Sequence, residues 1–138
     1  MRAVIDTNVF ISATLFKGKT SRLVDAWKSR KFAYLISGEI LKEYARVLSY
    51  PKFNLTENEI KFVLEEQLLP FVETVRVKEK ILNILKDKDD EKFLNCAAQG
   101  HADTIVSGDK GLLALGSYKK IKIISVSVFL TEKLKLPE

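Results

Sequence analysis

The sequence contains few of the residues that form cross-links, zinc sites or flexible segments. Its 138 residues include one Cys, one His, three Pro and six Gly. A single Cys excludes an intrachain disulfide, and one Cys with one His cannot supply the ligands of a typical zinc site. The 46% of hydrophobic residues is typical of a compact globular protein and excludes a disordered or fibrous chain. Cys96 lies in an apolar helical run, which predicts a buried structural thiol.

Long apolar runs are also missing. No segment approaches the ~18 consecutive apolar residues that indicate a membrane-spanning helix. The first residues reach a charged side chain before any hydrophobic region long enough for a signal peptide. We therefore expect a cytoplasmic protein with no membrane partner. The length predicts a single domain over residues 1–138, and we find no repeat, low-complexity segment or linker that would divide it.

The chain is basic, with 23 Lys and Arg residues against 18 Asp and Glu residues and a formal net charge of +5. Such a charge suits a polyanionic partner, because cationic side chains displace counterions from phosphates. A solvated lysine-rich surface explains the same charge equally well, so the charge alone identifies no partner.

Hydrophobic patterning alternates short strand-like segments with helix-like segments. The strand-like segments are residues 2–5, 32–36, 72–77, 104–107 and 122–124. Helices are expected after residue 7 and over residues 20–29, 38–50, 56–69, 90–99, 109–115 and 126–134, with loops at 86–89 and 116–120. This alternation predicts a three-layer α/β/α fold with a central, mostly parallel sheet of about four to five strands.

Acidic residues recur at the ends of the predicted elements. Asp6 and Asp109 each follow a strand, so both should lie at the same edge of a parallel sheet. Asp90 shares a helical stripe with Phe93 and Leu94 and should point inward, whereas Glu43 lies at the boundary of its own stripe. Each Asp alone is explained as well or better by a helix N-cap, and Glu43 by a solvated surface.

Taken together, the four carboxylates favour a metal site over four independent caps. Hard divalent cations such as Mg²⁺ and Mn²⁺ prefer carboxylate and water oxygens, and the set can hold one or two such ions. Because like charges repel, we expect at least one of these carboxyls to have a raised pKa when no metal is bound. His101 follows a helix-closing Gly and is expected at the surface or as a cap, not as a general base.

Three segments and one separate residue of the chain resemble the PIN-domain family. These are Val4-Ile5-Asp6-Thr7-Asn8-Val9, Glu43 in the helix after the second strand, Asp89-Asp90-Glu91-Lys92-Phe93-Leu94, and Ala102-Asp103-Thr104-Ile105-Val106-Ser107-Gly108-Asp109. The first and last are specific when they occur in this order, and Glu43 matches by position. The chain is most similar to the compact prokaryotic branch that includes VapC-type ribonucleases, the toxins of toxin–antitoxin pairs.

The resemblance implies a metal-dependent endoribonuclease that cuts single-stranded or structured RNA. Its catalytic and metal-binding residues would be Asp6, Glu43, Asp90 and Asp109. Asn8 and Ser107 would support the site by hydrogen bonds. Asp103 is expected at the opposite edge of the sheet, and Asp87 and Asp89 in a flexible acidic loop. An antitoxin protein is the partner that the resemblance implies.

An acidic pocket repels RNA, so basic residues near the motifs are expected to bring the substrate in. The candidates are Lys17, Lys19, Arg22, Lys52 and Lys110. The apolar residues of the segment from Thr56 to Leu69 could serve a homodimer or an antitoxin, although core packing explains them at least as well.

Two other functions fit part of the pattern. A phosphatase of the haloacid dehalogenase type also begins with an apolar strand and an Asp, but it usually has a second Asp two residues later, where this chain has Asn8. A catalytically degenerate PIN fold would bind RNA or protein with its carboxylates acting only as caps. Metal-dependent cleavage would separate the nuclease from both alternatives.

Overall fold

The computed structural model describes residues 1–137. These residues form one six-stranded sheet with α-helices packed against it. The strand order is β3-β2-β1-β4-β6-β5, and every neighbouring pair is parallel except β5 with β6. The strands are β1 (Arg2–Ile5), β2 (Ala33–Ser37), β3 (Val72–Val75), β4 (Thr104–Val106), β5 (Ser117–Tyr118) and β6 (Ile121–Ile124).

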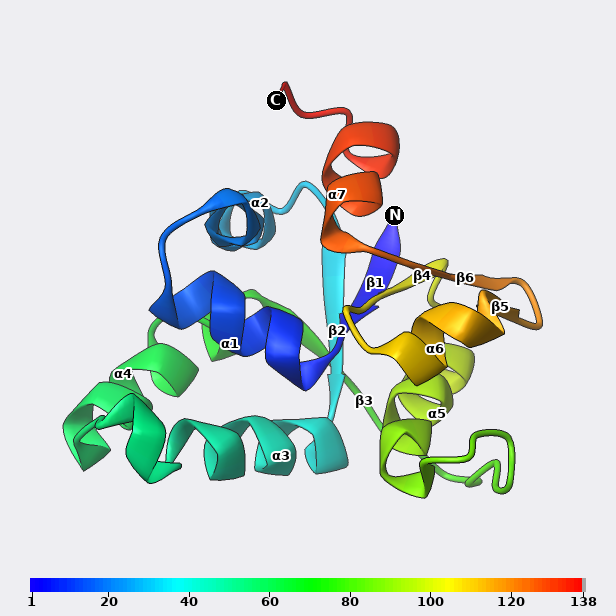
Figure 1. Ribbon diagram of the computed structural model, residues 1–138, viewed down its shortest axis with the longest axis horizontal. Helices are drawn as coiled ribbons and strands as arrows, with labels where there is room; N and C mark the ends of the chain where they lie inside the picture. The colour runs from blue at the N-terminus through cyan, green and yellow to red at the C-terminus, as the bar shows by residue number, and fades with distance from the viewer. Residues whose placement is uncertain (138) are drawn as a thin grey trace.

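Helices cover both faces of the sheet and complete the predicted three-layer α/β/α fold. They are α1 (Thr7–Leu15), α2 (Arg22–Lys28), α3 (Gly38–Leu48), α4 (Glu57–Glu65), α5 (Glu91–Gln99), α6 (Lys110–Leu115) and α7 (Val126–Val128). Figure 1 shows α1 to α4 on one side of the sheet and α5 and α6 on the other. Within residues 1–137, no helix combines the length and the apolar character needed to cross a membrane.

Three elements differ most clearly from the sequence-based expectation. The sheet has six strands because β5 forms in the segment expected to be a loop, where Lys119 at a φ of 55° turns the chain so that Tyr118 pairs with Ile121. Helix α4 ends at Glu65, and Leu69–Phe71 form a separate 3-10 turn because Pro70 cannot continue an α-helix. The final helix changes to a π-turn at Phe129–Lys133.

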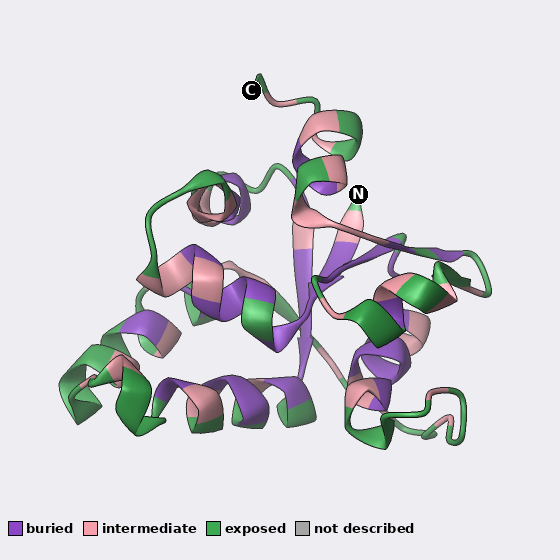
Figure 2. Ribbon diagram, in the orientation of Figure 1, coloured by how far each residue is buried: buried purple, intermediate pink, exposed green. Residues whose placement is uncertain are grey.

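The core lies on both sides of the central strands, whose residues are mostly coloured as buried in Figure 2. Tyr44 of α3 connects this core to the end of β1. Its ring stacks on Phe10, with ring centroids 4.0 Å apart. Its hydroxyl donates to the Ile5 carbonyl and also bonds to the Tyr34 hydroxyl 2.8 Å away. These contacts fix the backbone immediately before Asp6.

Gly100 ends α5 for a steric reason and not for the positive φ that often favours glycine after a helix. Its φ is −88°, and the next residue, His101, adopts the left-handed conformation with a φ of 55°. A Cβ at position 100 would lie 2.7 Å from a methyl carbon of Val75 and 3.0 Å from one of Leu35. The missing side chain therefore lets the end of α5 pack closely against β2 and β3.

The order in which successive strands are added to the sheet reverses between β1 and β4, which is therefore the topological switch point. From β1 the chain passes through α1 and α2 to β2 on one side, and from β4 it passes through α6 to β6 on the other. Open α/β sheets bind ligands in the crevice at the carboxyl ends of the strands at such a switch point. Asp6 follows β1 and Asp109 follows β4, so the fold brings both to this crevice.

We predict that Tyr44→Phe lowers the free energy of unfolding by about 1–3 kcal/mol, because it leaves the buried Ile5 carbonyl and the Tyr34 hydroxyl without their partner. The ring stack on Phe10 is retained, so the loss reports the hydroxyl alone. Chemical denaturation measures the change. Tyr50→Phe is the matched control, since that ring is 38% exposed, and it should remain at the wild-type value. Equal stability of the two variants would contradict the prediction.

Candidate functional site

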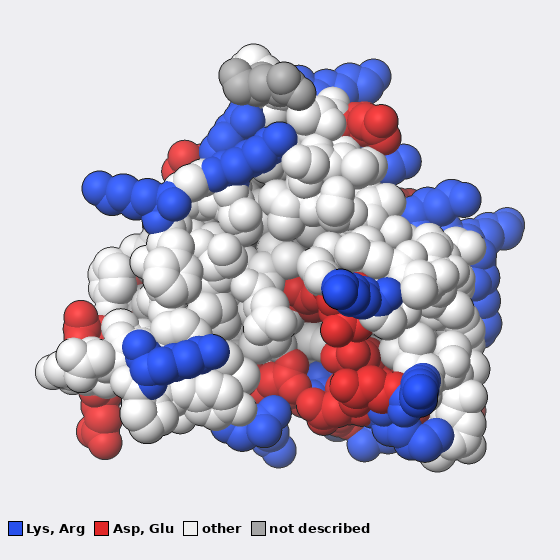
Figure 3. All heavy atoms as spheres, viewed as in Figure 1, with Lys and Arg blue, Asp and Glu red and all other residues white. Residues whose placement is uncertain are grey.

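A cavity of about 350 Å³ opens at the switch point. A second cavity of about 450 Å³ adjoins it and shares Asp87, Asp90 and Asp109. Figure 3 shows acidic side chains gathered in one band across this hollow, with Lys and Arg side chains at its edges. The first cavity is lined by Asp6, Thr7, Asn8, Glu43, Arg46, Val47, Tyr50, Lys52, Phe53, Asp87, Asp89, Asp90, Phe93 and Asp109.

Asp6 is both a helix cap and a buried carboxylate at the base of this cavity. Its Oδ1 accepts a hydrogen bond from the Val9 amide, which starts α1, and its Oδ2 accepts from the Ser107 hydroxyl and the Gly108 amide. Burial raises the pKa of Asp6, although these hydrogen bonds oppose the shift. A carboxylate has about four acceptor positions, so these three bonds leave one on Oδ1. Asp6 can thus cap α1 and still bind a cation.

Asp109 is held in a similar way across the cavity. Its Oδ2 accepts from the Leu112 amide and caps α6, which leaves Oδ1 without a hydrogen bond to another described residue. The Ser107 hydroxyl accepts from the Asp109 amide at 2.9 Å while donating to Asp6. Ser107 therefore forms a hydrogen bond of the kind we expected, and one hydroxyl links the two acids.

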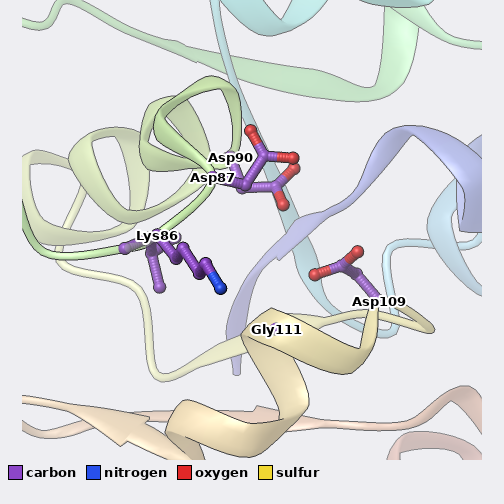
Figure 4. Close-up of a pocket in the computed structure, with 6 residues that line it drawn as sticks. Lys86, Asp87, Asp90, Asp109 and Gly111 are labelled. Carbon is purple, nitrogen blue, oxygen red and sulfur yellow. The ribbon is translucent and has the colours of Figure 1, made fainter.

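Asp90 does not cap its helix. It is the last residue of the 3-10 turn Lys88–Asp90 and directly precedes α5, and its side chain makes no capping hydrogen bond. Burial, followed by the charges of Asp109 and Asp87, raises its pKa to about 7. Figure 4 shows Asp90 beside Asp87 and facing Asp109 across the second cavity. The expectation that a carboxyl here has a raised pKa is confirmed.

Glu43 is more buried than its boundary position in the sequence pattern indicated. Its side chain is 10% exposed and is surrounded by donors. Lys92 of α5 lies 2.6 Å from Oε1, Arg46 lies 3.2 Å from the same oxygen, and the Thr7 hydroxyl donates to Oε2. Lys92 also contacts Asp89 at 3.1 Å, which lowers the pKa of that carboxyl. Although burial opposes it, the hydrogen bonds and charges of Glu43 and Asp89 raise the pKa of Lys92.

Glu91 fixes the loop that forms one wall of the second cavity. Its carboxylate accepts from the amides of Asn83, Ile84 and Leu85, and these bonds lower its pKa. The segment is therefore ordered against α5 by a buried side chain. Asp87, which we expected in a flexible loop, accepts from the Asp89 amide at 3.0 Å and lines both cavities.

The donor set at the switch point fits a hard divalent cation in its chemistry. Asp6, Asp90 and Asp109 offer carboxylate oxygens with no Lys or Arg in ion-pair contact among residues 1–137. No group of three or more His, Cys, Asp or Glu side chains in the described chain is arranged closely enough to hold an ion. Carboxylates of like charge repel, so their closer approach depends on a cation between them.

The other sequence-derived candidates divide between the site and more distant surfaces. Asn8 is exposed at the cavity wall, and its side chain forms no hydrogen bond with the described residues, unlike the supporting bond we expected. Asp103 accepts from the Arg2 amide at the opposite edge of the sheet, as expected. Lys52 lines the cavity and Lys110 adjoins Asp109. The remaining three, Lys17, Lys19 and Arg22, lie beyond the end of α1 that is far from Asp6.

Sequence reasoning missed Lys92 and underrated Asp87. Both are three residues from an acidic residue of interest, Lys92 from Asp89 and Asp87 from Asp90, a spacing that puts side chains on one side of a helical turn. Cys96 is buried, which confirms the structural thiol, and burial raises its pKa to about 12. His101 is exposed, in agreement with a surface position.

Comparison with known proteins gives two matches. Residues 2–111 match the PIN domain family, described as "PIN domain". The chain is also similar to the uncharacterized protein MJ1680 of Methanocaldococcus jannaschii, with 33% identity over 135 residues that cover 93% of this chain and 85% of that protein. The matched region includes Asp6, Glu43, Asp90 and Asp109 and the whole of α5.

We predict that the metal-free protein is less stable at pH 8 than at pH 5.5. Folded Asp90 has a pKa of about 7 against an ordinary value of 3.8, so the folded state takes up this proton more readily than the unfolded state. The stability that comes from this bound proton is therefore lost progressively as the pH rises from 3.8 to about 7, and pH 5.5 and pH 8 bracket the upper part of that loss. Urea unfolding in EDTA at the two pH values measures this loss.

Asp90→Asn should reduce this loss, because the amide stays neutral at both pH values. Asp89→Asn is the control, since Asp89 is ion-paired with Lys92 and is more exposed, so the wild-type loss should persist. A wild-type protein that is equally stable at both pH values would contradict the prediction, as would an unchanged loss in Asp90→Asn.

Proposed function

The chain belongs to the PIN domain family, and from that membership we propose that it is a metal-dependent endoribonuclease. PIN domains are generally nucleases and typically use divalent metal ions. The observation that carries the proposal is the convergence of Asp6, Asp90 and Asp109 on one cavity without basic partners, in a chain whose net charge is +5. Mutual repulsion of these carboxylates destabilises the folded protein unless a bound cation neutralises them.

The residues of the site have distinct roles in this proposal. A bound Mg²⁺ or Mn²⁺ would supply positive charge that activates a water and offsets charge on the phosphodiester. Asp6 and Asp109 are oriented by their capping bonds and by Ser107, so each presents a fixed carboxylate oxygen. Asp90 has no capping bond, so its carboxylate is free to turn toward the ion or the attacking water.

Basic residues beside the cavity would bring the substrate to these acids. Arg46 and Lys52 line the first cavity, and Lys86 reaches into the second in Figure 4. Together with Lys110 they place positive charge around the acidic band. The acids alone would repel the phosphate group to be cleaved, and these basic residues attract the phosphate backbone of the substrate. The more distant cluster of Lys17, Lys19 and Arg22 would contact the chain of the RNA away from the cleaved bond.

We extend the proposal to the toxin of a toxin–antitoxin pair, with an antitoxin or a second copy of the chain as protein partner. Phe16 and Phe62 support such a contact, because their side chains are 55% and 52% exposed. Large apolar side chains at the surface are common where partners bind. Co-purification with the product of an adjacent reading frame would test this extension separately from the chemistry.

The two alternatives make different use of the same residues. A degenerate binding domain would use Asp6 and Asp109 only as caps, and the absence of a preformed three-ligand group in residues 1–137 is compatible with it. A phosphatase would need Asp6 as the nucleophile. Three hydrogen bonds to the Asp6 carboxylate make it a weaker nucleophile and so disfavour that reaction.

We predict cleavage of RNA in Mn²⁺ or Mg²⁺ and none in EDTA. The products should carry no 2′,3′-cyclic phosphate, because an activated water and not the 2′-hydroxyl is the attacking group. Asp6→Asn and Asp90→Asn should each lower the rate by on the order of 100-fold or more. Incubation of purified protein with single-stranded RNA, structured RNA and DNA of the same sequence measures these rates.

Asp103→Asn is the matched control, because Asp103 is an exposed acid at the opposite edge of the sheet and should keep the wild-type rate. Equal residual cleavage by the wild type, Asp6→Asn and Asp90→Asn would indicate a contaminating nuclease and refute the proposed function. Metal-independent cleavage would refute it as well.

A further inference from the structure

The acidic band at the switch point consists of two parts with different counter-charges. Asp6, Asp90 and Asp109 have no Lys or Arg in ion-pair contact within residues 1–137. Glu43 and Asp89, in contrast, share the ammonium of Lys92. The protein itself therefore neutralises one part of the band and leaves the other part negative.

Lys92 is a largely buried, paired ammonium group and not a solvated charge at the surface. Its side chain is 10% exposed, as is that of Glu43, and the two charged groups are 2.6 Å apart. A charge removed from water to this extent is tolerated only when it is paired and hydrogen-bonded. Lys92 projects from α5 two residues after Asp90, so the helix that carries one acid of the site also carries this cation.

Three of the four acceptor positions of the Glu43 carboxylate are already occupied. Lys92 and Arg46 both donate to Oε1, which fills the two positions of that oxygen, and the Thr7 hydroxyl donates to Oε2, which keeps one position. A divalent ion could reach Glu43 only there, and it would lie close to the Lys92 ammonium, which is 2.6 Å from Oε1. Repulsion between the two positive charges disfavours metal binding at Glu43, whereas Asp6 has no such cation in ion-pair contact within residues 1–137.

We propose that Lys92 is an internal cation that limits the site to a single divalent ion, held by Asp6, Asp90 and Asp109, while Glu43 is a positioning residue that does not bind the ion. The inference rests on the proposed function only for the presence of that ion. Two-metal sites need ions about 3.5–4 Å apart that share carboxylates. Here the second positive charge comes from the side chain of Lys92.

Glu43 then acts through Thr7 and Lys92. The Thr7 hydroxyl belongs to the first residue of α1, next to Asp6, and Lys92 belongs to the first turn of α5, next to Asp90. One buried carboxylate therefore connects the starts of the two helices that carry metal-binding acids. Removing its charge should disturb the alignment of these helices without removing a metal ligand.

The number of bound ions tests the proposal. Titration calorimetry with Mn²⁺ should give one ion per chain for the wild type and one for Glu43→Gln. Asp90→Asn should weaken binding by about tenfold or more. Lys92→Met should bind two ions, because Glu43 and Asp89 lose their cation, and the electron paramagnetic resonance spectrum should show coupling between two Mn²⁺ ions.

Arg46→Met is the matched control. Arg46 contacts the same Glu43 oxygen at 3.2 Å, but its side chain is 57% exposed, so its loss leaves Glu43 paired with Lys92 and should leave one bound ion. Two ions in the wild type, loss of the ion in Glu43→Gln, or a single ion in Lys92→Met would each overturn the proposal. If Lys92→Met does not fold, Lys92→Gln serves the same comparison.

Thermal unfolding gives an independent reading. In EDTA, Lys92→Met should melt below the wild type, because the buried Glu43 loses its buried partner and keeps only the more exposed Arg46 as an ion pair. Saturating Mn²⁺ should raise its melting temperature more than that of the wild type, and the added substitution Glu43→Gln should abolish this extra gain. An equal Mn²⁺ shift in the wild type and Lys92→Met would count against the internal cation.

The proposed nuclease function fails in a different way. If the wild type binds one ion but cleaves no nucleic acid, the function is refuted and the role of Lys92 stands. If the wild type binds two ions and cleaves RNA, only the role of Lys92 is refuted. Binding of no ion would overturn both.

Discussion

Electrostatic repulsion among carboxylates at one edge of the sheet is the constraint on which the site depends. Asp6, Asp87, Asp90 and Asp109 line one cavity there, and the pKa of Asp90 is raised to about 7 by burial and by the charges of its neighbours. The repulsion persists in the folded protein because the fold fixes the backbone positions of these residues, and the capping bonds also fix the carboxylates of Asp6 and Asp109. The protein relieves the same repulsion at Glu43 and Asp89 with the ammonium of Lys92, so the uncompensated negative charge is confined to the switch point.

The fold creates this arrangement through the direction of its chain connections. Helices α1 and α6 leave adjacent strands toward opposite faces, and each begins with an Asp that caps it. Capping and cation binding do not compete at these positions, since a carboxylate has more acceptor positions than the caps occupy. Tyr44 and Ser107 fix the backbone and the side chain around Asp6, which links the stability of the core to the geometry of the site.

Much of the fold could be predicted from local patterns, because apolar runs, Pro51 and the Thr56 capping box define elements within the chain. The two-residue strand β5 could not, since it exists only by pairing with β6. Within the site, Asp6, Asp90 and Asp109 were found from their positions in the pattern. The pairing of Lys92 with Glu43 was not, because it joins residues 49 positions apart on two helices whose packing the sequence does not state. A helix cap was the simplest explanation for each of the three Asp residues taken alone, and Asp90 differs because it is the last residue of a 3-10 turn and its side chain makes no capping bond.

An anomalous difference map from crystals soaked in Mn²⁺ tests most directly whether the uncompensated acids form the metal centre. A single peak bounded by Asp6, Asp90 and Asp109, with Lys92 still paired to Glu43, is the predicted result. A peak between Glu43 and Asp89, or no peak at the switch point while the acids are accessible in the crystal, would contradict it.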